Sequence, residues 1–135
     1  MQTRWMMTTS AVLLAGLGLA ATFLPQEIVA ATGGAGGRGV PNGLAVLLVQ
    51  IAGGLYCGFA MLNWSVRDMV IGGIYNRPIA LGNLVHFIVV ALALARIVAG
   101  GERRAGVLAL TCLYGLFAGW FASTMFRSPV RDRKD

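Results

Sequence analysis

Three polar side chains of note lie within the apolar stretches, and they are the residues with which this chain could do chemistry. They are Gln50, Asn83 and His86. Asn83 and His86 are three residues apart, so on a helix they share one face. Polar groups inside apolar helices are costly, commonly face the interior of a helix bundle, and mark ion, proton or ligand sites. We therefore take these three residues as the candidate intramembrane polar site.

His86 is the only histidine in the chain and has three interpretations. The favoured one is a structural side chain that forms a hydrogen bond, ahead of a small-molecule or proton site and an axial haem ligand. A six-coordinate haem generally needs a second ligand, which Met61, Met69, Met125 or a second copy's His86 would have to supply. No second imidazole or carboxylate accompanies His86 in the apolar stretches, so we expect no metal site and no cofactor.

The sequence carries no arrangement typical of catalysis. Cys57 and Cys112 both lie within apolar stretches, where we expect them to be reduced and inert. No nucleophile–base pair or pair of carboxylates is recognisable. We therefore expect a protein that is not an enzyme.

The composition points to a membrane protein. Of the 135 residues, 57% are hydrophobic and 12% are charged, whereas a soluble domain carries about 25% charged residues. Four stretches without a charged residue are each long enough for a helix to cross a hydrocarbon core about 30 Å thick. They predict an all-α fold, a four-helix transmembrane bundle with antiparallel neighbouring helices, as one integral membrane domain over 1–135. The predicted spans are about 7–24, 44–64, 78–98 and 105–126.

The segments between the spans contain two distinctive stretches. Pro25 is expected to end the first helix, with a loop beginning at Pro25. Residues 31–43 form a glycine-rich loop; it lacks the strand and the Gly-Lys-Ser/Thr motif of a phosphate-binding loop, so we interpret it as a linker. An alternative for the first helix is a signal peptide, with Arg4 as its charged region and cleavage near Ala31.

The cations predict an orientation. Four spans place seven of the eleven Lys and Arg residues on the side of the two termini, so the positive-inside rule puts both termini in the cytoplasm. Residues 127–135 form a basic tail. Its cations either dock to lipids or a partner or serve only as a topology determinant, the favoured interpretation; they are Arg127, Arg131, Arg133 and Lys134. No nucleic-acid recognition module surrounds the cations, so we expect no nucleic-acid partner.

Small residues and charges suggest how the helices meet. Gly54 with Gly58 and Gly115 with Gly119 have the Gly-x-x-x-Gly spacing that lets membrane helices approach closely, and we expect them to favour packing within the chain over a homodimer. A second cluster lies at the predicted cytoplasmic interface, where Asp68 is expected to pair with a neighbouring arginine. This interfacial charge cluster consists of Arg67, Asp68 and Arg77.

One stretch resembles a known group of proteins. Leu62-Asn63-Trp64 at the end of the second predicted span, and Arg77-Pro78 followed by Asn83 and His86 in the third, resemble motifs of small bacterial four-helix membrane proteins. The similarity covers roughly residues 49–96. It implies a four-span protein of the bacterial inner membrane and no particular activity.

Two functions fit these observations. The first is an accessory or scaffold subunit of a larger membrane complex, in contact with membrane lipids and with other subunits or further copies of itself. The alternative is a small proton-linked or small-molecule transporter that uses Gln50, Asn83 and His86. We favour the first because no carboxylate lies at membrane depth and no internal repeat of the kind found in transporters is visible.

Overall fold

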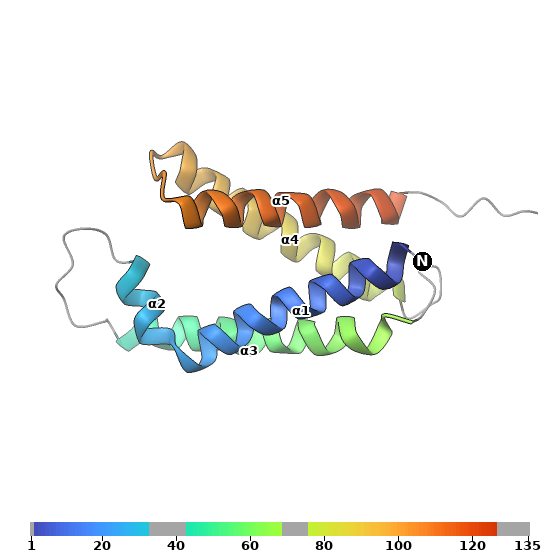
Figure 1. The fold of residues 1–135 in the computed structure, drawn as a ribbon, viewed down its shortest axis with the longest axis horizontal. Helices are drawn as coiled ribbons and strands as arrows, with labels where there is room; N and C mark the ends of the chain where they lie inside the picture. The colour runs from blue at the N-terminus through green and yellow to red at the C-terminus, as the bar shows by residue number, and fades with distance from the viewer. Residues whose placement is uncertain (1, 33–42, 69–75, 127–135) are drawn as a thin grey trace, which may run out of the picture. The chain divides into compact units, whose positions relative to one another are not determined.

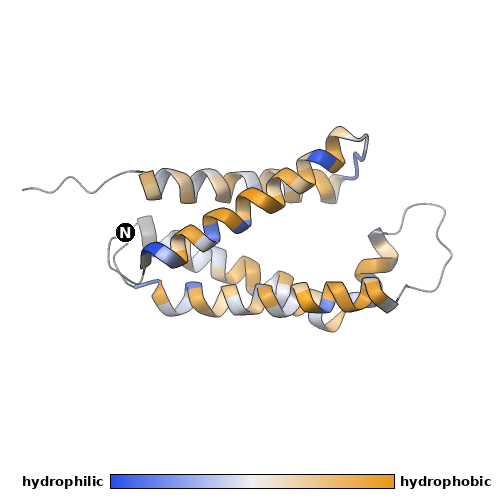
Figure 2. Ribbon diagram, turned by 180° about the vertical axis from the view of Figure 1, so that it is seen from behind, coloured by the Kyte–Doolittle hydropathy of each residue, from blue (hydrophilic) through white to orange (hydrophobic). Residues whose placement is uncertain are grey.

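The structure, a computed structural model, describes residues 2–32, 43–68 and 76–126 (Figure 1). Within these ranges it contains helices and no strand. The helices are α1 (Gln2–Phe23), α2 (Pro25–Thr32), α3 (Gly43–Val66), α4 (Asn76–Ala99) and α5 (Ala105–Phe126). Four of them, α1, α3, α4 and α5, are long and apolar enough to cross a membrane, and Figure 2 shows hydrophobic residues along most of their length. The predicted all-α fold with four membrane-spanning helices is confirmed.

The predicted helix boundaries agree within two residues except at the start of α1, which begins at Gln2 and not near Met7. The fourth span matches α5, and α1 ends at Phe23, two residues before Pro25. The loop expected from Pro25 onward is wrong, because Pro25 begins the short helix α2. A proline suits a first helical position, where its missing N–H costs nothing, and Glu27 in the first turn is favoured by the helix dipole.

The glycine-rich loop and the basic tail fall mainly outside the described residues. Residues 33–42 and 127–135 are not among them. Of the predicted loop 31–43, the first two residues belong to α2 and the last begins α3.

The helices form two compact units, one of residues 7–67 and one of residues 1–6 with 68–135. In the first unit, α1 and α3 run antiparallel and approach closely at Gly18 and Gly53. A Cβ atom placed on Gly18 would lie 2.7 Å from Cys57 Sγ, and one on Gly53 would lie 2.6 Å from Thr22 Oγ1. Neither position has room for a side chain, so these two glycines set the distance between the helices.

The second unit contains α4 and α5, joined by a tight turn. Gly101 has a φ of 104°, a conformation that glycine adopts without steric cost. The Gly101 N–H donates to Val98 O at 3.1 Å and the Glu102 N–H donates to Ile97 O at 3.3 Å, which is the Schellman motif that ends many helices. The Glu102 carboxylate then accepts from the backbone N–H of Arg104 and pairs with its guanidinium at 3.3 Å. The chain thereby reverses, and α4 and α5 run antiparallel (Figure 1).

The first turn of α1 belongs to this second unit. Arg4 forms an ion pair with Asp68 at 3.0 Å, and Thr124 Oγ1 donates to Met6 Sδ at 3.5 Å. The start of α1, the second residue after α3 and the last turn of α5 therefore lie at one end of the unit.

Candidate functional site

His86 lies in an aromatic cluster between α4 and α5. It is within about 2 Å of the middle of α4 along the helix axis, at 1.5 Å per residue. Its ring meets those of Phe87 and Tyr114 edge to face, with centroid distances of 5.3 and 5.8 Å. Aromatic rings favour this geometry, because the positive edge of one faces the negative face of the other. His86 is thus one ring of a packed group.

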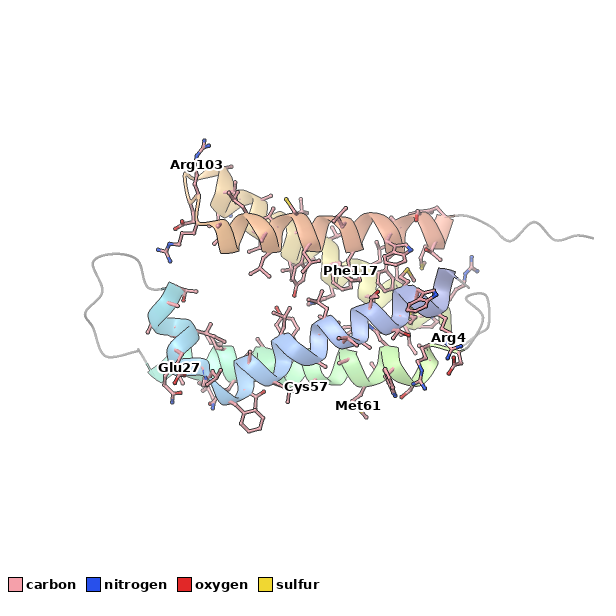
Figure 3. All side chains as sticks on the ribbon, viewed as in Figure 1. Arg4, Glu27, Cys57, Met61, Arg103 and Phe117 are labelled. Atoms are coloured by element: carbon pink, nitrogen blue, oxygen red, sulfur yellow. The ribbon has the colours of Figure 1, made fainter. Side chains whose placement is uncertain are left out.

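The centre of that cluster is Phe87, which is fully buried. Its ring stacks on Phe117 with a centroid distance of 4.9 Å and an interplanar angle of 14°, and on Phe121 at 5.4 Å and 23°. Figure 3 shows Phe117 among the side chains of α5. The contact between α4 and α5 is therefore built from interlocking rings around the position that also carries His86.

Asn83, one turn before His86, is also fully buried. Its amide nitrogen donates to the backbone carbonyl of Ile79 at 2.9 Å. An amide that bonds to its own helix has part of its hydrogen-bonding capacity used locally. This contact indicates a structural role for Asn83.

Gln50, the third member of the predicted polar site, has a different setting. It lies in α3, in the unit of residues 7–67, whereas Asn83 and His86 lie in the other unit. Its side chain is exposed. The two α4 residues are a turn apart on one helix as predicted, and each unit supplies only part of the proposed polar site.

The sequence analysis missed a buried polar pair in the unit of residues 7–67. Asn63 donates from its amide nitrogen to Ser10 Oγ at 3.0 Å, and Ser10 donates to the carbonyl of Met7 at 3.0 Å. Both side chains are fully buried. Asn63 lies next to the end of the predicted span 44–64, so the sequence placed it at the membrane interface; α3 continues to Val66. The feature of the sequence that could have revealed this pair is the Asn63 amide, which lies within a predicted apolar span.

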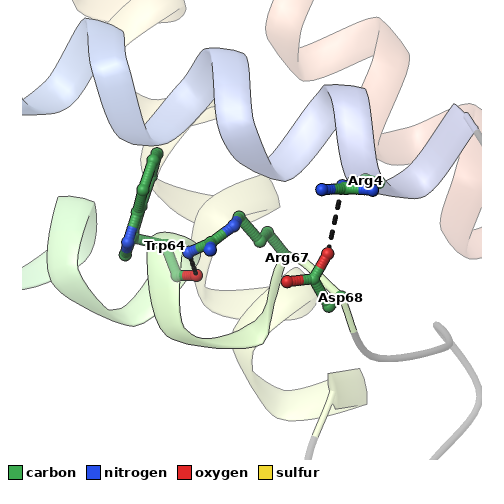
Figure 4. Close-up of polar contacts among 4 residues, drawn as sticks. All are labelled: Arg4, Trp64, Arg67 and Asp68. Carbon is green, nitrogen blue, oxygen red and sulfur yellow. Dashed lines mark hydrogen bonds and ion pairs between the residues drawn. The ribbon is translucent and has the colours of Figure 1, made fainter.

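Figure 4 shows Arg67 and Asp68, two members of the predicted interfacial charge cluster, at the end of α3. Asp68 pairs with Arg4 of the first helical turn, a partner that the sequence analysis did not name. The expected pairing with Arg67 or Arg77 stays a prediction. Both side chains of this pair are more than half exposed, at 68% and 57%, and such pairs contribute about 0–1 kcal/mol. Arg77, the third predicted member, is exposed at the start of α4.

Arg67 lies against its own helix. Its guanidinium donates to the carbonyl of Trp64 at 2.8 Å and lies 4.0 Å from the centroid of the Trp64 ring. The first contact satisfies one of the carbonyls left without an N–H partner at the end of α3, and the second is a cation–π interaction. Arg67 therefore closes the end of α3 beside an aromatic residue typical of the membrane interface.

The predicted Gly-x-x-x-Gly pairs make no close helix contact within their own units. A Cβ atom placed on any of the four glycines meets nothing within 4 Å among the described residues; they are Gly54, Gly58, Gly115 and Gly119. The close helix contact uses Gly18 and Gly53 instead. Gly53 immediately precedes Gly54 and therefore lies on a different face of α3.

The structure also bears on the residues considered as metal ligands, on the two cysteines and on the methionines considered as haem ligands. Among the described residues no group of three His, Cys, Asp or Glu side chains could hold a metal ion. Cys57 and Cys112 are free thiols, the first half-buried and the second exposed. Of the methionines considered as haem ligands, Met61 points away from α3 (Figure 3), and Met69 lies outside the described residues.

The fold defines the class as a multi-pass α-helical membrane protein. No protein-family model matches the chain, no curated protein matches it, and no solved structure matches it. The resemblance to small bacterial four-helix membrane proteins therefore stays a prediction.

Proposed function

We propose that this protein is a non-enzymatic accessory or scaffold subunit of a larger complex in the bacterial inner membrane, with both termini in the cytoplasm. The observation that carries the proposal is one face of α3. Gln50, Gly54 and Gly58 follow each other at intervals of four residues, and all three are exposed. Met61, on the same face, is 68% exposed. We call these four residues the α3 face.

The α3 face has the chemistry of a helix–helix contact in a membrane. Gln50 lies about 7 Å from the middle of α3 along its axis, at 1.5 Å per residue, which is well inside the hydrocarbon. A primary amide there has donors and an acceptor that lipid tails cannot satisfy. A second helix satisfies them by a hydrogen bond across the interface, and the two glycines let its backbone come close.

The buried amides of the chain behave differently from Gln50. Asn63 bonds to Ser10 and Asn83 bonds to the carbonyl of Ile79, so each contributes to the structure of its own unit. The α1–α3 contact uses Gly53 and leaves the α3 face uncovered within residues 7–67. An amide with glycines beside it, on a face its own unit does not use, is suited to binding a partner helix.

The alternative, a small transporter, is favoured by one observation. His86 lies close to the middle of α4, where an ionisable residue is a functional candidate by default. Against it, His86 packs edge to face on two rings. Asn83 bonds to its own helix. We therefore place transport second.

Purification in mild detergent from the native membrane tests the proposal. The tagged protein is expected to bring down another membrane polypeptide in a fixed ratio. Gln50→Leu should lose this partner and keep its own melting temperature. Gln26→Leu is the matched control, because Gln26 is an exposed amide of α2 outside the four spans, and it should keep the partner.

Two results would overturn the proposal. One is a wild-type protein that purifies without any other polypeptide. The other is a ligand-dependent rise in melting temperature that His86→Phe abolishes, which is the result expected of a transporter.

A further inference from the structure

We draw no further inference here: the strongest candidate, the exposed α3 face formed by Gln50, Gly54, Gly58 and Met61, belongs to the proposed function already described, and nothing in the structure shows whether a second copy or a different protein covers it.

Discussion

Asn63 of α3 donates a hydrogen bond to Ser10 of α1, and both side chains are fully buried. This contact joins residues 53 positions apart in the sequence. It is continued by the bond from Ser10 to the carbonyl of Met7. Together with the crossing at Gly18 and Gly53, it makes α1 an integral part of the unit of residues 7–67.

The first prediction concerns this polar pair. Ser10→Ala should lower the free energy of unfolding by about 0.6 kcal/mol and at most about 1.7 kcal/mol, the range measured for hydrogen bonds between membrane helices. The measurement is unfolding in mixed detergent micelles followed by circular dichroism. Ser65→Ala is the control, because Ser65 is exposed and bonds to the carbonyl of Met61 in its own helix. Equal losses in the two variants would contradict the role given to Ser10.

The second prediction uses two adjacent glycines. Gly53→Ala should destabilise the protein by about 1–3 kcal/mol, as overpacking generally does, because the new Cβ would lie 2.8 Å from the backbone nitrogen of Thr22. Gly54→Ala should leave the stability of the purified chain unchanged or raise it, since alanine is the better helix former and nothing lies within 4 Å. Melting temperatures of the two variants in the same detergent make the comparison. A larger loss for Gly54→Ala would refute the assigned faces of α3.

The third prediction concerns α1, which packs against α3. Cleavage near Ala31 would remove Ser10, Gly18 and Thr22, which all contact α3. We expect the mature protein to keep α1. Intact-mass measurement of protein purified from the native membrane checks this. A mass that corresponds to a chain starting near Ala31 would establish the signal-peptide alternative.

A fourth prediction separates packing from chemistry at His86. Phenylalanine keeps an aromatic ring against Phe87 and Tyr114 and removes the titratable group, so His86→Phe should retain the melting temperature and the co-purified partner. Phe87→Ala should cost about 3–5 kcal/mol, because Phe87 is fully buried and stacks on Phe117 and Phe121. If the His86→Phe variant keeps its full stability but fails to replace the wild-type protein in cells, a proton or ligand site at His86 would be favoured instead.

Much of the fold could be predicted from the distribution of charges. The stretch without charged residues over 105–126 coincides with α5, because the cost of burying a charge in lipid limits where charged residues can lie. Pro25 was correctly predicted to end α1. Its second role, as the first residue of α2, was missed because a proline that stops one helix is equally suited to begin another.

The contacts between helices could not be predicted in the same way. Gly53 and Gly54 are adjacent and chemically identical, and only the rotation of α3 about its axis decides which one meets α1. A rule based on spacing selected Gly54 and Gly58, whereas the structure uses Gly53. Asp68 likewise pairs with Arg4, which is distant in sequence. Such pairings depend on how helices are assembled, and composition does not encode that assembly directly.

Photo-cross-linking from the α3 face tests the central claim most directly. A photoreactive residue in place of Met61 lies on this face, and one in place of Leu116 of α5 is the control; the native side chains are 68% and 72% exposed. After irradiation in native membranes, we predict a discrete protein adduct from position 61 and lipid adducts only from position 116. Lipid adducts alone from both positions would contradict the account, because the α3 face would then have no partner helix.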